Sequence, residues 1–355
     1  MRPCYVYGAQ TMAYDIVQAL EHAGQQIEGY VVTRMEGNPS SIRGKAVVPI
    51  DALDLATRPK FFVAVPGYLH EEIGHILEAK GFHDYECVDA GREYRWMKEY
   101  YRSEGWLKFL EDYGTPEASE AGAVPARDLE IYVAKSAGDH PLAGVAAFPE
   151  GCVTVQAGAA LGVAVPADFR DDEGENISVR NSHYDELTVA YWAWKNRRAA
   201  VKGLFHYRRC IALTAEERRA LLDGRVDAVL PLPFLCYPDT GMQYARYNRP
   251  EAVEAMLSAI GRVHGEKMRS SAEKVLKGDL LYNYNMLVAQ AGVFDGYCSW
   301  MFPVLAEVEE LCRDMLPEGV HTRICGHLGE LLETIYFRSC GIGLRVVHGK
   351  KVWFV

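Results

Sequence analysis

The stretch from residue 182 to residue 209 constrains this chain more than any other part of the sequence. Its first half predicts a helix over 182–196, opened by the capping-box-like Ser182–Asp185 and buried along an apolar stripe at i, i+3, i+4 and i+7. The apolar run Val201–Phe205 then predicts a strand, which ends directly in the segment His206-Tyr-Arg-Arg209. Ligands of α/β proteins collect at the carboxyl ends of strands, so segment 206–209 marks the expected binding site.

Length and charge limit the classes of protein to which this chain can belong. The 355 residues, 49% of them hydrophobic, are enough for two domains with their own cores. A net charge of −10 argues against a general nucleic-acid-binding protein. Between residues 195 and 209, however, six Lys and Arg residues occur without an acid, which favours a small anionic ligand such as a phosphate. The alternative is a solvated basic face.

Cysteine usage and hydropathy indicate a cytoplasmic protein. The nine cysteines form no Cys-x-x-Cys pair, so neither a zinc site nor a disulfide framework is predicted, and free thiols fit a reducing compartment. No apolar run approaches the roughly 18–20 residues of a spanning helix. The N-terminus predicts a strand rather than a signal peptide. Peripheral association with a membrane stays open.

Residues 1–92 predict a small Rossmann-like domain. Strands are expected at 4–7, 27–32, 61–65 and 85–88, with helices at 12–22 and 71–79. The first turn has only Gly8 and lacks Gly-x-Gly-x-x-Gly, so a redox dinucleotide site is not expected. The segment resembles the small N-terminal domain of sugar-modifying acyltransferases and some polysaccharide-synthesis enzymes, which leaves a nucleotide, sugar or docking role open. Residues 93–127 predict a helical connector that ends in a linker at Ala118–Pro125.

Residues 128–355 predict a second α/β domain. Strands are expected at 129–134 and 153–156, an acidic turn follows at 171–178, and residues 344–355 predict a terminal hairpin that turns at Gly349. Trp192 lies off the apolar stripe of its helix and is a candidate for stacking on a base or sugar.

Seven motifs of this domain occur in order and together resemble a known family. It is the glycosyltransferase-like domain family of bacterial capsular and exopolysaccharide gene clusters, long catalogued as a domain of unknown function. The motifs are Asp172-Glu-Gly-Glu-Asn-Ile-Ser178, Asn181-x-x-Tyr184-x-Glu186-Leu-Thr188, Tyr191-Trp-Ala-Trp-Lys-Asn196, Gly203-Leu-Phe-His-Tyr-Arg-Arg209, Asn285-Met286, Phe294-Asp295-x-Tyr-Cys-x-Trp300 and Gly326-His-Leu-Gly-Glu330. The resemblance implies a GT-A-like fold and sugar transfer from a nucleoside diphosphate donor. His327 and Cys210 depart from the usual pattern, which puts substrate detail in doubt.

Sugar transfer requires stabilisation of the leaving diphosphate. Many GT-A enzymes carry an Asp-x-Asp metal motif where this chain has segment 206–209. That segment is basic, so we predict that Arg208 or Arg209 neutralises the diphosphate directly, with His206, a candidate catalytic residue, forming a hydrogen bond there. In an extended segment His206 and Arg208 share one face and Arg209 takes the other. The competing explanation is an ion pair between one arginine and a buried acid such as Glu186.

Further candidates complete the donor side. They are Lys135, Asp172, Asn176, Glu186 and Lys195. Asp171 and Asp172 are also the only nearby candidates for a divalent metal such as Mn²⁺ or Mg²⁺. The residues after them look like a plain turn, so no metal is firmly predicted, and transfer is expected to persist in chelator.

An inverting transferase also needs a base for the acceptor hydroxyl. Glu330 is the candidate, because it is placed in the first turn of a helix and off that helix's core stripe of Leu328, Leu331, Leu332, Ile335 and Tyr336. Compensation of the helix dipole is the alternative. Asn285, His327 and Tyr247, the last in a Pro- and Tyr-rich loop, are candidates for the acceptor side.

Two functions follow from these features. The first is a cytoplasmic hexosyltransferase, acting at the inner face of the plasma membrane on an oligosaccharide or lipid-linked acceptor, with a UDP-sugar as the default donor. The alternative is a non-catalytic nucleotide-sugar-binding or scaffold protein of the same pathway.

Overall fold

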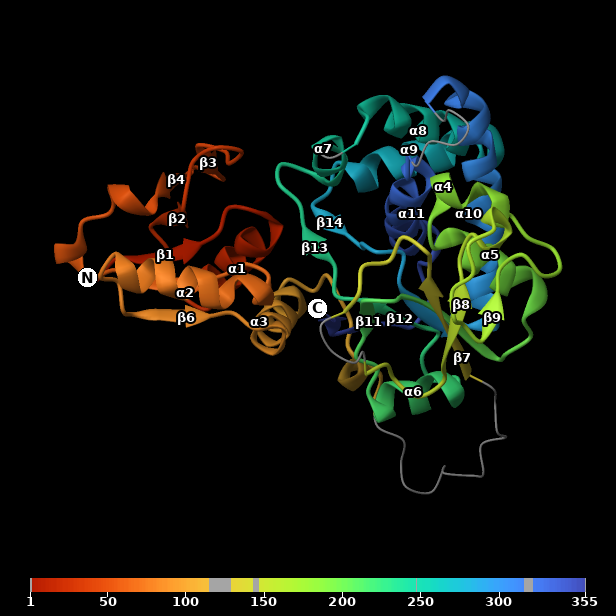
Figure 1. Cartoon of the computed structure of the whole chain (residues 1–355), viewed down its shortest axis with the longest axis horizontal. Coiled ribbons are helices and arrows are strands. Elements are labelled where there is room, and N and C mark those ends of the chain that lie inside the picture. Colours follow the sequence, from red (N-terminus) through yellow and green to blue (C-terminus); the bar gives the residue numbers. More distant parts are fainter. Residues whose placement is uncertain (1, 115–128, 143–146, 247, 316–321, 355) are drawn as a thin grey trace. The chain divides into compact units, whose positions relative to one another are not determined.

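The computed structural model describes residues 2–114, 129–142, 147–246, 248–315 and 322–354. They form two compact units, one from Met1–Leu107 with Phe234–Pro238 and the other from Lys108–Pro233 with Asp239–Val355 (Figure 1). The predicted α/β class is confirmed, because each unit contains parallel strands connected through helices. The predicted linker Ala118–Pro125 lies outside the described residues.

Unit 1 is a sheet in the order β3-β4-β2-β1-β5-β6, in which all neighbours except β3 and β4 are parallel. Its core packs apolar side chains such as Tyr7, Val31 and Phe61. The strands are β1 (Cys4–Tyr7), β2 (Gly29–Val32), β3 (Ser41–Ile42), β4 (Lys45–Pro49), β5 (Lys60–Val63) and β6 (Tyr85–Cys87), and the helices are α1 (Thr11–His22), α2 (His70–Ala79) and α3 (Ala90–Ser103).

A short segment from much later in the chain completes unit 1. It contains β13 (Phe234–Leu235), whose backbone N–H at Leu235 donates to the buried carboxylate of Asp15, 2.9 Å away. The Tyr237 ring packs against that of Tyr14, with centroids 5.8 Å apart. Helix α3, most of which falls in the predicted connector 93–127, also belongs to this unit.

Unit 2 is built on a long mixed sheet in the order β16-β12-β15-β10-β7-β8-β9. Strands β9, β8, β7 and β10 are parallel, and the direction in which the chain adds strands reverses between β7 and β10. Such a reversal opens a crevice at the carboxyl ends of the two strands. The bounds are β7 (Leu129–Lys135), β8 (Cys152–Gln156), β9 (Phe169–Arg170), β10 (Val201–His206), β11 (Arg209–Ile211), β12 (Ala228–Pro231), β14 (Leu280–Leu281), β15 (Leu287–Gln290), β16 (Val346–Gly349) and β17 (Lys351–Trp353).

Helices cover this sheet and build the rest of unit 2. They are α4 (Asn181–Tyr184), α5 (Leu187–Asn196), α6 (Ala215–Leu222), α7 (Thr240–Ala245), α8 (Pro250–His264), α9 (Glu266–Leu276), α10 (Ala291–Leu311) and α11 (Ile324–Ile335). Helix α5 packs on β7 and β10, while α10 packs on α5, α8 and α11. Among the described residues no helix combines the length and apolar content needed to cross a bilayer.

The helix predicted over 182–196 is interrupted. Asp185 has φ 47° and ψ −128°, which ends α4 after one turn, and α5 begins at Leu187. The capping-box interpretation of Ser182–Asp185 is therefore wrong. Trp192 is also not available to a ligand, because it is buried against Tyr132 and Phe169 with centroids 5.9 and 5.7 Å away.

The predicted terminal hairpin is wrong as well. Two strands do flank the turn near Gly349, but they pair with different neighbours. Strand β16 runs parallel to β12, whereas β17 runs antiparallel to β11 and places Trp353 opposite Arg209. Hydrophobic alternation predicts that a strand exists but not which partner it finds.

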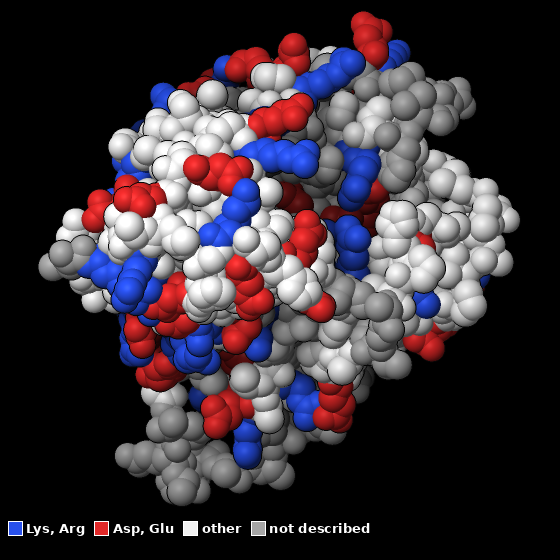
Figure 2. Space-filling view, turned by 60° about the vertical axis from the view of Figure 1, so that its left-hand side comes forward, with Lys and Arg blue, Asp and Glu red and all other residues white. Residues whose placement is uncertain are grey.

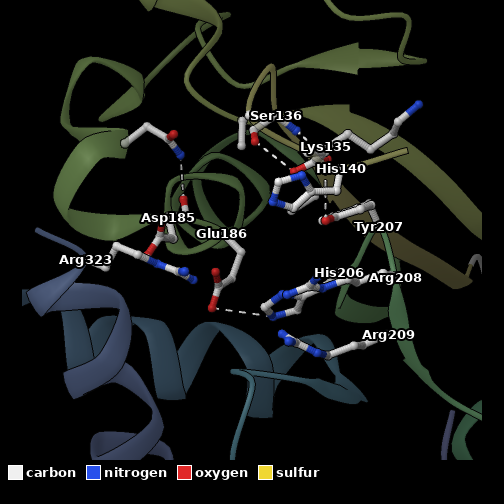
Figure 3. Close-up of a pocket in the computed structure, with 15 residues that line it drawn as sticks. Lys135, Ser136, His140, Asp185, Glu186, His206, Tyr207, Arg208, Arg209 and Arg323 are labelled. Atoms are coloured by element: carbon white, nitrogen blue, oxygen red, sulfur yellow. Dashed lines mark hydrogen bonds and ion pairs between the residues drawn. The ribbon is translucent and has the colours of Figure 1, made fainter. Parts of the chain in front are cut away.

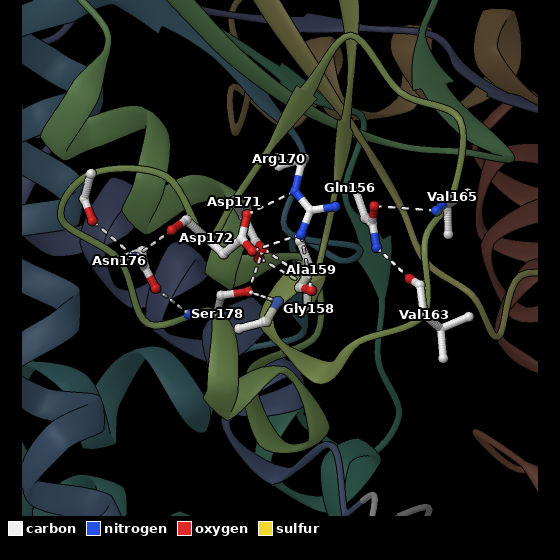
Figure 4. A network of polar contacts seen from close by, with 12 residues as sticks. Gln156, Gly158, Ala159, Val163, Val165, Arg170, Asp171, Asp172, Asn176 and Ser178 are labelled. Carbon is white, nitrogen blue, oxygen red and sulfur yellow. Dashed lines mark hydrogen bonds and ion pairs between the residues drawn. The ribbon is translucent and has the colours of Figure 1, made fainter.

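The acidic turn after β9 is tied to the preceding loop by Asp171 (Figure 4). This fully buried carboxylate accepts hydrogen bonds from the backbone N–H groups of Gly158 (2.9 Å) and Ala159 (3.0 Å) and from the hydroxyl of Ser178 (2.5 Å). Asp172 instead forms a two-point ion pair with Arg170 at the surface. Asp171 is therefore a structural clamp, which two neighbouring acids in a sequence do not reveal.

Replacing Asp171 by alanine is expected to lower the free energy of unfolding by about 2–4 kcal/mol, because three buried donors lose a charged acceptor. The matched change Asp172→Ala removes a surface ion pair and should cost less than about 1 kcal/mol. Urea titration of both variants measures the difference. Equal stabilities of the two variants would contradict the clamp.

Candidate active site

A pocket of about 260 Å³ lies at the point where the strand order reverses (Figure 3). The carboxyl end of β7 contributes Lys135 and Ser136, and the end of β10 contributes His206. An apolar pocket of about 580 Å³ adjoins it and shares the loop 135–140 and Tyr207 as a wall. The place predicted from segment 206–209 is therefore a real cavity.

Segment 206–209 is a tight turn rather than an extended run. His206 at the end of β10 pairs with Arg209 at the start of antiparallel β11, with only Tyr207 and Arg208 between them. Directly paired residues of two antiparallel strands lie side by side on one face. The prediction that Arg209 points away from His206 is thus wrong, and all four residues of the turn line the pocket.

Arg208 and Arg209 keep their charge available. Among the described residues neither forms an ion pair with a carboxylate, so the predicted alternative of a pair with Glu186 is not found. The Nε of Arg209 is shielded from solvent and makes no hydrogen bond there. On the face shown in Figure 2, basic and acidic side chains are intermixed. Two unpaired guanidinium groups in a pocket of an acidic protein favour an anionic ligand.

His206 is held as a neutral ring. Its Nε2 donates to the carbonyl oxygen of Tyr284 at 2.5 Å, which leaves Nδ1 as the acceptor nitrogen. Burial, together with the neighbouring Arg209, lowers the pKa of His206 to about 3. His206 is therefore uncharged at physiological pH and can accept a proton or a hydrogen bond only through Nδ1.

Glu186 forms the wall opposite the turn. Its Oε1 accepts from the Asn285 side-chain amide at 2.6 Å and lies 3.5 Å from His206 Nε2. Burial and the like charge of Asp185 raise the pKa of Glu186 to about 7. Asn285 reaches this position because Gly329 has no side chain: a Cβ there would lie 2.6 Å from the Asn285 amide oxygen. Asn285, predicted for the acceptor side, is itself buried and does not line the pocket.

Glu330 lies beside this group but not in the first turn of its helix. Helix α11 begins at Ile324, so Glu330 is in the second turn, and the core stripe predicted around it is buried from Leu328 to Ile335. Its Oε1 accepts from the backbone N–H of Tyr284 at 3.0 Å. Burial and the nearby Glu186 raise the pKa of Glu330 to about 7.

The pocket is surrounded by strained backbone. Of the six non-glycine residues with positive φ in the described ranges, four lie here: Asp185, Tyr284, Asn285 and Arg323. Each such residue costs on the order of 1–3 kcal/mol, and residues of this kind cluster at functional sites. Arg323 and Asp185 form an ion pair (Nε–Oδ2 2.9 Å) on the side of the pocket opposite Arg208 and Arg209 (Figure 3). Sequence reasoning missed this pair, because 138 residues separate the two and neither is part of a chemical motif.

The other predicted site residues fall into three groups. Lys135 lines the pocket and donates to the carbonyl of Pro166 at 3.1 Å. Lys195, Asp172, Asn176 and His327 do not line it; Lys195 pairs with Glu175, and Asn176 holds its own turn through the carbonyls of Asp172 and Gly174. Tyr247 lies outside the described residues.

The described residues of the site do not fit a divalent metal of the kind that the fold family implies. In the ranges the structure covers, no three His, Cys, Asp or Glu side chains come together as a metal-binding group. The oxygens of Asp171 already accept three hydrogen bonds, and those of Asp172 face Arg170. Such cations prefer carboxylate and carbonyl oxygens, whereas this turn offers guanidinium groups.

A family model described as a domain of unknown function (DUF4422) matches residues 147–340, which is more than half of the chain. The chain belongs to this family. Among solved structures it is similar to the apo structure of the WbbM bifunctional glycosyltransferase, with 21% identity and a TM-score of 0.54. That match covers 64% of this chain and 45% of the other, so the chain spans less than half of that protein. No curated protein matches. The comparison supports a glycosyltransferase-like fold, in agreement with the resemblance carried by the seven motifs.

A third acid lies deeper in this family member than Glu186 and Glu330. Glu333 is fully buried on α11, and within the described part of the chain neither of its oxygens has a hydrogen-bond partner. Burial raises the pKa of Glu333 well above its usual value, and the nearby Glu330 adds to the effect. The folded protein therefore favours the neutral carboxyl more strongly than the unfolded chain does.

Replacing Glu333 by methionine is expected to raise the free energy of unfolding by about 1–3 kcal/mol at pH 7, because an unsatisfied polar group leaves the core. The folded pKa lies above the unfolded one, so the wild type should lose stability as pH rises from about 4.5 towards neutrality. Glu333→Gln should reduce the dependence of stability on pH, but it should raise the free energy of unfolding less than Glu333→Met does. Chemical denaturation at several pH values tests this, and a destabilised Glu333→Met would show that the carboxyl makes a needed contact.

Proposed function

We propose that this protein transfers a hexose from a nucleoside diphosphate sugar, with a UDP-sugar as the default, to a growing cell-surface polysaccharide or its lipid-linked precursor. The observation that carries the proposal is the turn between β10 and β11, whose two arginines lack carboxylate partners in the described residues and line a pocket at the strand reversal. Family membership and the glycosyltransferase-like fold support the reaction class. In this proposal the protein works in the cytoplasm at the inner face of the plasma membrane.

The proposed role of Arg208 and Arg209 follows from where charge develops. As the bond between the sugar C1 and the phosphate oxygen breaks, the electron pair moves onto the diphosphate. Guanidinium groups already fixed in a partly dry pocket stabilise that charge without rearranging. Arg208 lies at the tip of the turn, and Arg209 lies at the start of β11. The two guanidinium groups can therefore bind different oxygens of one diphosphate.

The acceptor hydroxyl must lose its proton as its oxygen bonds to C1, and we assign this proton to Glu330 in an inverting reaction. A base works best when its pKa lies near the working pH, and that of Glu330 is raised to about 7. Glu186 lies close enough to raise this pKa further, so the two carboxyls titrate as a pair. The neutral His206 lies 3.5 Å from Glu186 and donates to the carbonyl of Tyr284, whose backbone N–H donates to Glu330.

Arg208→Ala is expected to weaken UDP binding by about 10- to 150-fold, because a desolvated diphosphate loses a charge-assisted partner worth about 1.5–3 kcal/mol. The matched control is Arg218→Ala on α6, which removes an arginine paired with Glu150 at the surface. Calorimetric titration with UDP compares the variants. Unchanged affinity in a folded Arg208→Ala protein would reject this role for the side chain.

Glu330→Gln is nearly isosteric but cannot accept a proton, so it should keep its affinity for the donor and lose transfer by a factor of about 10²–10⁴. In the wild type, kcat/KM should rise with pH through about 7, since the base must be ionised. Transfer assays with a radiolabelled sugar measure both. Near-normal turnover in Glu330→Gln would reject the assignment, and a protein that binds UDP-sugars but transfers none would favour the non-catalytic alternative.

A further inference from the structure

Arg209 lies where a charged side chain is difficult to hold in one position. It is partly buried, its Nε is shielded from water without a hydrogen bond, and the described residues supply no carboxylate partner. Burial and the charge of Arg208 lower its pKa, which shows that the surroundings disfavour the cation. A free side chain under these conditions would turn towards solvent, where an arginine is better hydrated.

Two aromatic rings hold it instead. The Arg209 guanidinium carbon lies 4.3 Å from the centroid of the Tyr284 ring and 4.5 Å from that of Trp353. The two rings stand nearly perpendicular, at 86° with centroids 5.0 Å apart, and form a corner around the cation. Tyr284 comes from the strained bend before β15, and Trp353 comes from β17, where it pairs directly with Arg209 in the sheet.

We propose that Trp353 is a positioning residue of the anion site, which together with Tyr284 fixes Arg209 by cation–π contact and leaves its charge for the bound anion. An acid in the same place would hold the guanidinium equally well, but it would neutralise the charge and compete with the ligand for the N–H donors. A ring attracts the cation through its quadrupole and adds no net charge. The inference rests on the proposed function only for the identity of the anion.

The test measures binding of inorganic pyrophosphate and of UDP by calorimetry. Trp353→Leu should weaken pyrophosphate binding by about three- to thirtyfold, the range expected for loss of a cation–π contact. Trp353→Phe should restore most of the affinity, since it keeps a ring in place. Trp300→Leu is the matched control, because Trp300 stacks on His264 and lines neither pocket. Trp353→Thr is a second ring-free variant that suits a strand if leucine disturbs folding.

A double-mutant cycle separates positioning from direct contact. If Trp353 acts only through Arg209, Trp353→Leu adds no further loss in an Arg209→Ala background. Unchanged pyrophosphate affinity in Trp353→Leu overturns the proposal, and so does a loss that persists in the Arg209→Ala background, because the ring would then touch the ligand itself. If the wild type binds pyrophosphate but not UDP, the proposed nucleotide-sugar donor is rejected. The double-mutant cycle with pyrophosphate still tests whether Trp353 positions Arg209. A wild type that binds neither overturns both.

Discussion

The candidate site depends on a left-handed bend at Tyr284 and Asn285, with φ values of 76° and 48°. The backbone of Tyr284 donates to Glu330 and accepts from His206, and its ring contacts Arg209. Asn285 turns the other way and holds Glu186. Two adjacent residues in ordinary strand geometry point to opposite faces, so without the bend they could not contact these four side chains together. The strain of the bend is the cost of gathering these groups in one place.

The charged groups around the bend form two sets, two arginines on one side and two buried carboxyls on the other. On one side the arginines of the β10–β11 turn carry charge that no described carboxylate neutralises. On the other, burial raises the pKa values of Glu186 and Glu330 to about 7, so near neutral pH each carboxyl is present in both its protonated and its ionised form. In the proposed reaction an anionic ligand pairs with the arginines, and the ionised form of Glu330 takes the proton of the acceptor hydroxyl.

Much of the scaffold could be predicted from the sequence, because β7, β8 and β10 are apolar runs that end in polar residues. That pattern predicted the position of the pocket and, among the residues that line it, Lys135, His206, Arg208 and Arg209. Glu186, which also lines it, was predicted from its helix and from the family motif. What could not be predicted depends on contacts distant in sequence. Asp171 was a candidate metal ligand in the sequence, but in the structure its carboxylate accepts three hydrogen bonds. Arg209 lies beside His206 because β11 pairs with β10. Arg323 contacts Asp185, from which 138 residues separate it in the sequence.

The pairing of β17 with β11 has a consequence for the order in which the protein is made. Arg209 leaves the ribosome early in the synthesis of unit 2, well before Trp353, which comes from the last strand described. A nascent chain therefore carries the basic turn for more than a hundred residues with one side of Arg209 uncovered. Until β17 pairs with β11, Arg209 lacks the ring of Trp353, so the two-ring contact around its guanidinium forms only when this sheet is complete.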